Sequence, residues 1–351
     1  MRAGRDDKDD GTGPPPPRSN PDLLGHEVAE ATLRRLFQSG RMPHALLLSG
    51  QRGIGKATLA YRFARFVLAG GAGQGASPGL FASDHAGLAI PPDSGTFRRV
   101  ASGGHADLLT VERAYDPRRR RLRSEIVVDD AREIAAFLRL TPAEGGWRVV
   151  VVDGADEMNR NAANSLLKIL EEPPRNALLL LVAHSPGRLL PTIRSRCRRF
   201  PLPPLPAETV RRLLAQYRPD LPESQTEALI ALSGGSIGRA LDLAVAGGVE
   251  LHATVSKLFA GVDDVAGLHA FADRLARSEA EDAYRAVEDL IALELAGLAS
   301  TTAQSSNPAK AARWAELREE IAGSFARTDA LNLDRKQTIL GAFFAIDGAA
   351  R

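Results

Sequence analysis

The sequence has little cysteine, no long apolar run and almost no net charge. One cysteine among 351 residues excludes an internal disulfide framework and any metal site built from several cysteines. We therefore expect a reducing, cytoplasmic compartment. No apolar run reaches the roughly 18 residues of a membrane span, so we expect no membrane partner. The net charge is only +2, so any surface for nucleic acid or protein must come from local clusters of charge.

The first 20 residues differ in composition from the rest. They mix acidic and basic residues, contain four consecutive prolines at 14–17, and lack the apolar segment of a signal peptide. Such a stretch cannot bury a core. We predict that residues 1–20 form a disordered tail.

The remaining length and pattern predict more than one domain. From residue 43 onward, short apolar runs alternate with helical patterns, which is typical of a parallel sheet flanked by helices. Four prolines between 201 and 206 indicate a junction, and the sequence beyond it is helical throughout. We predict an α/β domain over 21–202, a small helical domain over 203–248 and an all-α domain over 249–351.

Within the first domain the pattern predicts individual elements. Strands are expected at 45–48, 108–111, 147–152 and 178–183, and 70–104 is expected to be an insertion or long loop. Asn159 is expected to cap one helix, and Asp129 or Asp130 to cap another.

A phosphate-binding loop follows the strand at 45–48. Residues 50–56, Gly-Gln-Arg-Gly-Ile-Gly-Lys, match the G-x-x-x-x-G-K part of the P-loop motif, but Ala57 stands where the motif has a Ser or Thr that binds Mg²⁺. The loop joins a strand to a helix N-terminus, a context that favours phosphate. The motif predicts these nucleotide-binding residues: Gly50, Gly53, Gly55, Lys56, Ala57 and Thr58.

Asp153 ends a strand of four consecutive valines. In P-loop enzymes such an aspartate holds Mg²⁺ opposite the loop. By itself, an aspartate at this position would more often simply cap the end of the strand. Beside a P-loop, we predict that Asp153 belongs to the nucleotide site.

Two further motifs carry a family resemblance. Residues 164–174, Asn-Ser-Leu-Leu-Lys-Ile-Leu-Glu-Glu-Pro-Pro, are followed about twenty residues later by Ser195-Arg196-Cys197. In this combination they resemble the clamp-loader branch of the AAA+ proteins. With 234–239, similar to the start of a sensor-2 helix that carries Arg239, the resemblance extends from Asp22 to Arg239. It implies an AAA+ P-loop domain, a small helical lid and a helical collar for oligomerisation.

The resemblance also marks what this chain lacks. Active AAA+ proteins usually have a glutamate after the Asp153 position, which activates the attacking water, whereas this chain has Gly154. Asp156 and Glu157 lie nearby, but a shift of two or three residues moves a side chain by several Å, so we expect neither to replace that base. The pairing of an intact Ser-Arg-Cys triplet with an impaired nucleotide site is similar to the delta-prime subunits of bacterial DNA polymerase III.

That similarity implies a role for Arg196. In the family this arginine reaches the ATP bound by a neighbouring motor subunit, where it neutralises charge that develops on the γ-phosphate. The alternative is that Arg196 is one member of a solvated arginine cluster. Ser195 and Cys197 complete the motif, and Cys197 is expected to be a small buried residue.

Other residues permit two interpretations. His184 and Ser185 end a strand where related ATPases carry a polar sensor, and they could also be an ordinary polar pair. Arg239 could serve a nucleotide or hold the helical lid in place. The basic run over 118–123 could be a solvated hairpin or a contact to primer-template DNA.

The leading hypothesis is a clamp-loader subunit of DNA polymerase III without autonomous ATPase activity. The implied partners are gamma/tau-like and delta-like subunits, the sliding clamp and primer-template DNA. ATP or ADP could remain bound, with Mg²⁺ weak or absent, and we expect no zinc because the segment between the P-loop and Asp153 has no cysteine. Two alternatives remain: an active gamma/tau-type ATPase in which Thr58 supplies the missing hydroxyl, and an assembly scaffold with a vestigial P-loop.

Overall fold

The computed structural model describes residues 13–71, 87–116, 121–144, 146–305 and 307–350. The chain divides into two units, one formed by Met1–Pro219 with Gly235–Gly238, the other by Asp220–Gly234 with Arg239–Arg351. The domain boundaries expected near 203 and 249 remain predictions.

The first unit is built on a five-stranded parallel sheet with the strand order β2-β5-β6-β1-β7. The ends of the predicted strands are confirmed to within one residue. The sheet has one more strand, β7, which the sequence pattern did not predict. The strands of this sheet are β1 (Ala45–Ser49), β2 (Leu108–Val111), β5 (Arg148–Asp153), β6 (Ala177–Ala183) and β7 (Arg198–Pro201). A separate antiparallel pair is formed by β3 (Tyr115–Asp116) and β4 (Arg121–Leu122).

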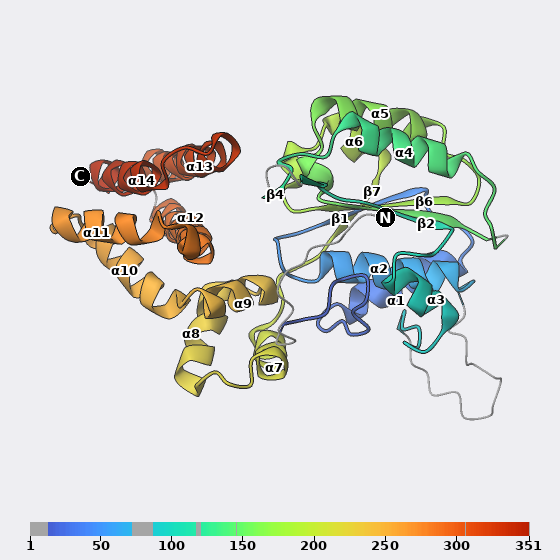
Figure 1. Ribbon diagram of the computed structural model, residues 1–351, viewed down its shortest axis with the longest axis horizontal. Helices are drawn as coiled ribbons and strands as arrows, with labels where there is room; N and C mark the ends of the chain where they lie inside the picture. The colour runs from blue at the N-terminus through green and yellow to red at the C-terminus, as the bar shows by residue number, and fades with distance from the viewer. Residues whose placement is uncertain (1–12, 72–86, 117–120, 145, 306, 351) are drawn as a thin grey trace. The chain divides into compact units, whose positions relative to one another are not determined.

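Helices cover both faces of the sheet, which confirms the predicted α/β class. In Figure 1, α1, α2 and α3 lie on one face and α4, α5 and α6 on the other. Helices of the first unit are α1 (Glu27–Gln38), α2 (Lys56–Leu68), α3 (Gly95–Ala101), α4 (Val128–Leu138), α5 (Arg160–Glu171), α6 (Pro191–Arg196) and α7 (Ala207–Tyr217), with short 3-10 helices η1 (Ala155–Glu157) and η2 (Pro186–Arg188).

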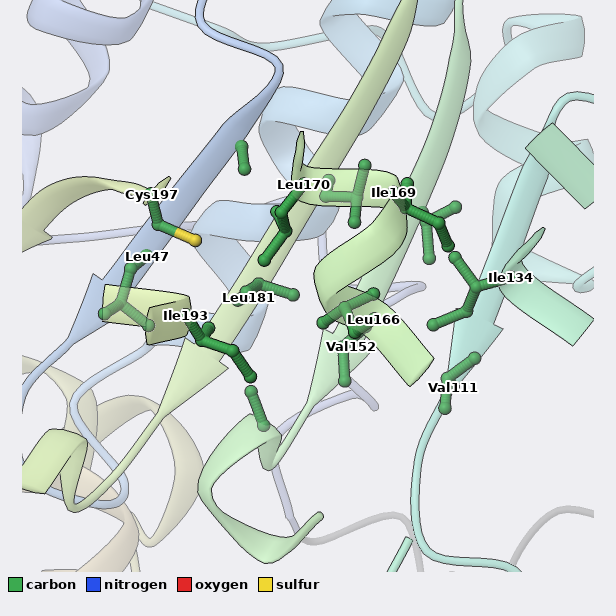
Figure 2. Packing of buried hydrophobic residues seen from close by; sticks show 14 of the residues in the cluster. Leu47, Val111, Ile134, Val152, Leu166, Ile169, Leu170, Leu181, Ile193 and Cys197 are labelled. Atoms are coloured by element: carbon green, nitrogen blue, oxygen red, sulfur yellow. The ribbon is translucent and has the colours of Figure 1, made fainter. Parts of the chain in front are cut away.

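The core lies between the sheet and these helices. Strands β5 and β6 read as continuous apolar runs because both of their faces are covered, and their central residues are fully buried. Figure 2 shows one of these faces, where Leu47, Val152 and Leu181 of the sheet meet Leu166 and Ile193 of the helices. This packing fixes the strand ends, and the site residues follow those ends.

Helix caps show one confirmed prediction and one correction. The Asn159 side chain accepts a hydrogen bond from the Ala162 N–H (3.0 Å), as expected for an N-cap. The cap of α4 is Val127, not Asp129 or Asp130. Asp130 lies at the third helical position, where its carboxylate accepts the Val127 N–H (3.0 Å). An acidic residue in the first turn stabilises the helix from inside rather than from the cap.

Two segments are more ordered than expected. The stretch 70–104 includes the helix α3, which is capped by the Ser94 hydroxyl; this hydroxyl accepts the Phe97 N–H (3.1 Å). Residues 72–86 of the stretch lie outside the described part of the chain. The second half of the predicted tail is packed against the first unit. The buried Arg65 guanidinium donates to the carbonyls of Arg18 (2.9 Å) and Asn20 (2.8 Å), so backbone acceptors hold this segment in place.

The second unit is all-helical in its described residues, as predicted. Tyr284 and Phe325 pack with ring centroids 5.0 Å apart in its core. Among the described residues, no helix is long and apolar enough to cross a membrane. The helices are α8 (Glu223–Ser233), α9 (Ile237–Val245), α10 (Gly248–Ala260), α11 (Val265–Leu275), η3 (Ser278–Ala280), α12 (Glu281–Gln304), α13 (Pro308–Leu331) and α14 (Arg335–Ala350).

Candidate nucleotide site and the Arg196 corner

The P-loop connects the carboxyl end of β1 to the first turn of α2. Gly50, Gly53 and Gly55 have φ angles of 152°, 78° and 96°. These left-handed conformations favour glycine because a Cβ would strain them. Gly55 caps α2, whose first N–H groups have no intrahelical acceptor and are available to an anion. The loop therefore has the backbone geometry of a phosphate site.

Distant segments of the same unit hold this loop from outside. The Gly238 N–H donates to the Gly53 carbonyl (3.0 Å), and the Ser236 hydroxyl donates to the Arg52 carbonyl (2.7 Å). A Cβ on Gly53 would lie 2.9 Å from the Gly238 Cα. Sequence reasoning did not find this support, although the 234–239 motif was its signal.

Lys56 is folded back onto the loop. Its ammonium donates to the carbonyls of Gly50 (2.7 Å) and Gln51 (2.5 Å), and the residue is 3% exposed. Burial lowers the pKa of Lys56 to about 8, a shift that the charge of Asp153 partly opposes. The lysine is thus placed inside the loop, where a bound phosphate would compete with the two carbonyls.

The two residues after Lys56 offer a poor metal ligand set. Ala57 has no side-chain oxygen. Thr58 is one residue further along α2, about 100° around the helix axis from Ala57, and it is 9% exposed. Its hydroxyl is therefore directed differently from the one that the motif requires.

Asp153 lies at the carboxyl end of β5, at the same end of the sheet as the P-loop, with β6 between them. Burial, with the nearby carboxylates of Glu112 and Glu157, raises the pKa of Asp153 to about 6, while Lys56 opposes the shift. The structure thus brings together the predicted carboxylate and the predicted lysine, because each lowers the cost of burying the other.

Glu157 lies closer to Gly154 than the sequence led us to expect. An extended chain after β5 would carry Glu157 away from Gly154, but the 3-10 helix η1 turns the chain back. One Glu157 carboxylate oxygen is 2.5 Å from where a Cβ on Gly154 would be, and another contact is an ion pair with Arg113 (2.8 Å). Burial raises the pKa of Glu157, and the charge of Arg113 opposes this.

Asp156 and His184 have structural partners that the sequence did not reveal. The Asp156 carboxylate accepts the N–H groups of His184 (3.0 Å) and Ser185 (2.7 Å), which links η1 to the end of β6. Burial, together with the charge of Lys56, lowers the pKa of His184 to about 4. The buried His184 Nδ1 has no hydrogen-bond partner among the described residues. A neutral imidazole therefore stands beside the P-loop lysine.

Arg196 lies at the opposite end of the sheet. It ends α6, two residues before Arg198, which pairs with Leu46 at the start of β1. The P-loop begins four residues after Leu46, about 13 Å along the strand direction. The Arg196 guanidinium is partly exposed and donates to Glu171 (2.8 Å) and to the Thr192 carbonyl (3.1 Å). Arg196 and the chain's own P-loop are therefore separated by the length of the strand.

The flanking residues of the Ser-Arg-Cys triplet have helix-end and core positions. The Ser195 hydroxyl donates to the Thr192 carbonyl (3.1 Å). Cys197 is buried in the core cluster near Leu47 and Ile193 (Figure 2), and burial raises its pKa to about 12. Cys197 is a thiol that packs as a small apolar residue, as expected.

Two other predicted residues or segments lie elsewhere. Arg239 belongs to the second unit, where its guanidinium is 3.9 Å from Asp289. Residues 118–120 of the basic run lie outside the described residues. No group of three or more His, Cys, Asp or Glu side chains that could hold a metal ion occurs in the described ranges, and the absence of zinc stays a prediction.

Comparison with known proteins gives consistent relatives. The family model described as DNA polymerase III, delta subunit, matches residues 25–206. DNA polymerase III subunit delta' of Pseudomonas aeruginosa is 38% identical over 195 residues, which is 55% of this chain and 53% of that protein. Subunit gamma/tau of Mycobacterium bovis is 30% identical over 284 residues, 78% of this chain and 46% of that protein. The chain thus spans about half the length of these curated relatives.

Among solved structures, a DNA polymerase III gamma subunit-related protein of Thermotoga maritima matches with a TM-score of 0.44 and 19% identity, over 92% of this chain and 100% of that one. The family model, by contrast, covers just over half of the chain and includes the P-loop, Asp153 and Arg196. The chain belongs to the DNA polymerase III delta-subunit family of clamp-loader proteins.

Proposed function

We propose that this chain is a delta-prime-type subunit of a clamp loader and that Arg196 acts on ATP held by a neighbouring gamma/tau-type subunit. In this role it would close a ring with gamma/tau-like and delta-like partners and help to load the sliding clamp on primed DNA. The C-terminal helical unit would serve as the oligomerising collar. The chain would contribute to the activity of DNA polymerase III through assembly, without an ATPase cycle of its own.

The position of Arg196 is the observation that carries the proposal. An arginine that helps phosphoryl transfer must touch the phosphate, and about 13 Å of strand lies between Arg196 and the P-loop of the same chain. The side chain is partly exposed and is held by Glu171, itself 49% exposed. A surface ion pair of this kind contributes roughly 0–1 kcal/mol, so a phosphate on another subunit could take the place of Glu171.

The state of the chain's own P-loop supports the second half of the proposal. Ala57 offers no hydroxyl to a metal, and Gly154 offers no carboxylate to a water. The left-handed φ of Gly154 (79°) also disfavours a glutamate at that position. The glycines and Lys56 are nevertheless in place, so we propose that ATP or ADP binds here without turnover, with weak or no use of Mg²⁺.

The test is ATP hydrolysis by the reconstituted complex. Replacing Arg196 by Ala should lower the DNA- and clamp-stimulated rate at the site that Arg196 serves by about 10³-fold, because arginine fingers contribute on that order. Arg196→Lys keeps the charge but loses the planar fork, and should recover little of the rate. Assembly is checked by gel filtration of each complex.

Arg198→Ala is the matched control. Arg198 is an exposed arginine two residues away, on β7, and its loss should leave the rate unchanged. Equal rates for the Arg196→Ala complex and the wild-type complex would refute the proposal.

A second candidate is an active gamma/tau-type ATPase. The observation in its favour is the Glu157 carboxylate, which lies where a side chain on residue 154 would begin. Hydrolysis by the isolated full chain, abolished both by Lys56→Ala and by Glu157→Gln, would favour this candidate over the first. A chain that neither binds nucleotide nor responds to Arg196→Ala would instead be an assembly scaffold.

A further inference from the structure

The donors around the P-loop do not suit a Mg²⁺-dependent nucleotide site. A P-loop Mg²⁺ is held by the Ser or Thr after the lysine and by the aspartate that ends the facing strand. Here the Ala57 side chain has no oxygen. Thr58, the next residue of α2, lies about 100° around the helix axis from position 57, so its hydroxyl does not take the place of the missing one. Asp153 is then left as the one ligand of that pair, so the residues present do not fit the metal.

A second cation lies at the same end of the sheet. Arg113 follows the end of β2, and β5 and β6 lie between β2 and the P-loop strand β1. His184, at the end of β6, feels the charges of both Lys56 and Arg113 and so lies between the two cations. The Arg113 guanidinium Nε lies 2.8 Å from Glu157, whose carboxylate is folded over Gly154. Both side chains are partly exposed, at 27% and 22%, so the pair can separate. Arg113 would then offer a planar, permanently charged group to a phosphate.

Two more groups are available on the same side. The Lys56 ammonium donates to two carbonyls of its own loop, and these carbonyls are weaker partners than a phosphate. The His184 Nδ1 is buried and lacks a hydrogen-bond partner in the described residues. An unpartnered buried polar atom costs free energy, which an oxygen of a bound ligand would recover.

We propose that this site binds the polyphosphate of a nucleotide without a divalent cation, and that Arg113, released from Glu157, supplies the charge that a metal would otherwise provide. The inference rests on the proposal that the P-loop retains nucleotide. No bond is made or broken. Glu157 acts as the resting partner of Arg113, so nucleotide and Glu157 compete for the same guanidinium.

Calorimetric titration of the full chain tests the inference. The ligands are ADP and the β,γ-imido analogue of ATP, each with EDTA and then with Mg²⁺. The wild-type Kd should differ by less than about threefold between the two conditions, and Arg113→Ala should weaken binding in EDTA by about tenfold or more. Arg132→Ala, which removes an exposed arginine on α4, is the control and should bind as the wild type does.

Two further variants make the test directional. Glu157→Gln frees Arg113 and should tighten metal-free binding, a gain that a misfolded variant could not produce. Ala57→Ser restores the hydroxyl and should make binding tighter with Mg²⁺ than with EDTA. Wild-type binding that needs Mg²⁺, an Arg113→Ala variant that binds like the wild type, or no binding under either condition would overturn the inference. None of these results bears on Arg196, because the proposed trans role is measured separately in the assembled complex.

Discussion

The two ends of the central sheet bear different chemistry. At the carboxyl end, Lys56 of the P-loop, Asp153 and Glu157 are buried or half-buried ionisable residues. Burial is the largest cause of the pKa shift of each of them. At the amino end, Arg196 stands at the surface in a single exposed ion pair with Glu171. The carboxyl end has the backbone geometry of a phosphate site, whereas the amino end has an exposed arginine.

This difference separates two tasks that many ATPases combine. A site that holds a nucleotide needs a glycine loop, buried charges and contacts that hold the loop in place. The carboxyl end has all three. A group that acts on another subunit's phosphate needs exposure and a weak partner that it can leave, and the amino end has these. The chain thus keeps the architecture of a P-loop protein, while Arg196 is exposed at the end of the sheet opposite its own P-loop.

The largest effect is expected in the P-loop at the carboxyl end, which the segment 235–238 supports. Gly53→Ala must accept a positive φ (78°) and a contact of 2.9 Å with the Gly238 backbone. A left-handed alanine costs about 1–2 kcal/mol, and the crowding should add about 1–3 kcal/mol to the loss of unfolding free energy. Urea unfolding measures the sum.

Gly40→Ala is the matched control for that variant. Gly40 has a φ of 67° with no atom within 4 Å of its Cβ position, so only the backbone term applies. Equal losses for the two variants would show that the segment 235–238 does not support the loop.

The second prediction concerns the carboxylate that ties η1 to β6. Asp156→Asn replaces a charged acceptor of two backbone N–H groups by an amide, which should lower the unfolding free energy by about 1–3 kcal/mol. Asp129→Asn, which alters an exposed carboxylate on α4, should change it by less than about 0.5 kcal/mol. A variant at 156 as stable as the one at 129 would contradict the structural role of Asp156.

The third prediction uses pH at the carboxyl end. The pKa of His184 is lowered to about 4 from 6.5, so the unfolded chain binds more protons in that window and His184 reduces stability as the pH falls. The pKa of Asp153 is raised to about 6 from 3.8, so the folded chain binds more protons and Asp153 has the opposite effect.

Single variants separate these two contributions. Between pH 6.5 and 4, His184→Asn should lose less stability than the wild type, and Asp153→Asn should lose more. Unfolding free energies at several pH values give the slopes. Slopes for both variants parallel to that of the wild type would contradict the burial of these groups.

The smallest effect is expected at the amino end. Glu171→Ala removes the resting partner of Arg196 and should change the unfolding free energy by less than about 1 kcal/mol, because the pair is exposed. The reconstituted ATPase should keep its rate or increase it. Glu172→Ala, at the adjacent exposed position, serves as control. A marked drop in the ATPase rate for Glu171→Ala, but not for Glu172→Ala, would mean that Glu171 positions Arg196 for its role rather than pairing with it only in the free chain.

Local patterns predicted the elements of the first unit well. The P-loop strand, the valine strand before Asp153 and the Asn159 cap follow from apolar runs and cap chemistry, which depend on near neighbours in sequence. The α4 cap was misplaced because an acidic residue is stabilising at the cap and within the first turn alike.

Contacts between distant segments were not predictable in this way. The position of Glu157 depends on the 3-10 helix η1, which no apolar periodicity in the sequence predicts. It also depends on Arg113, which follows the end of β2. The Gly53 support comes from residues nearly two hundred positions away. The placement of Arg65 under the segment 18–20 likewise required the fold. The composition of residues 18–20 indicates that this segment cannot form a core by itself. It does not indicate that the segment packs against the core of the first unit.

ATP hydrolysis by a complex reconstituted with the Arg196→Ala chain decides whether Arg196 serves a phosphate outside its own chain. We expect a complex that assembles normally, binds clamp and DNA, and hydrolyses ATP about 10³-fold more slowly at the site that Arg196 serves, while Arg198→Ala has no effect. A normal rate with Arg196→Ala, in a complex whose assembly is verified, would contradict this role of Arg196.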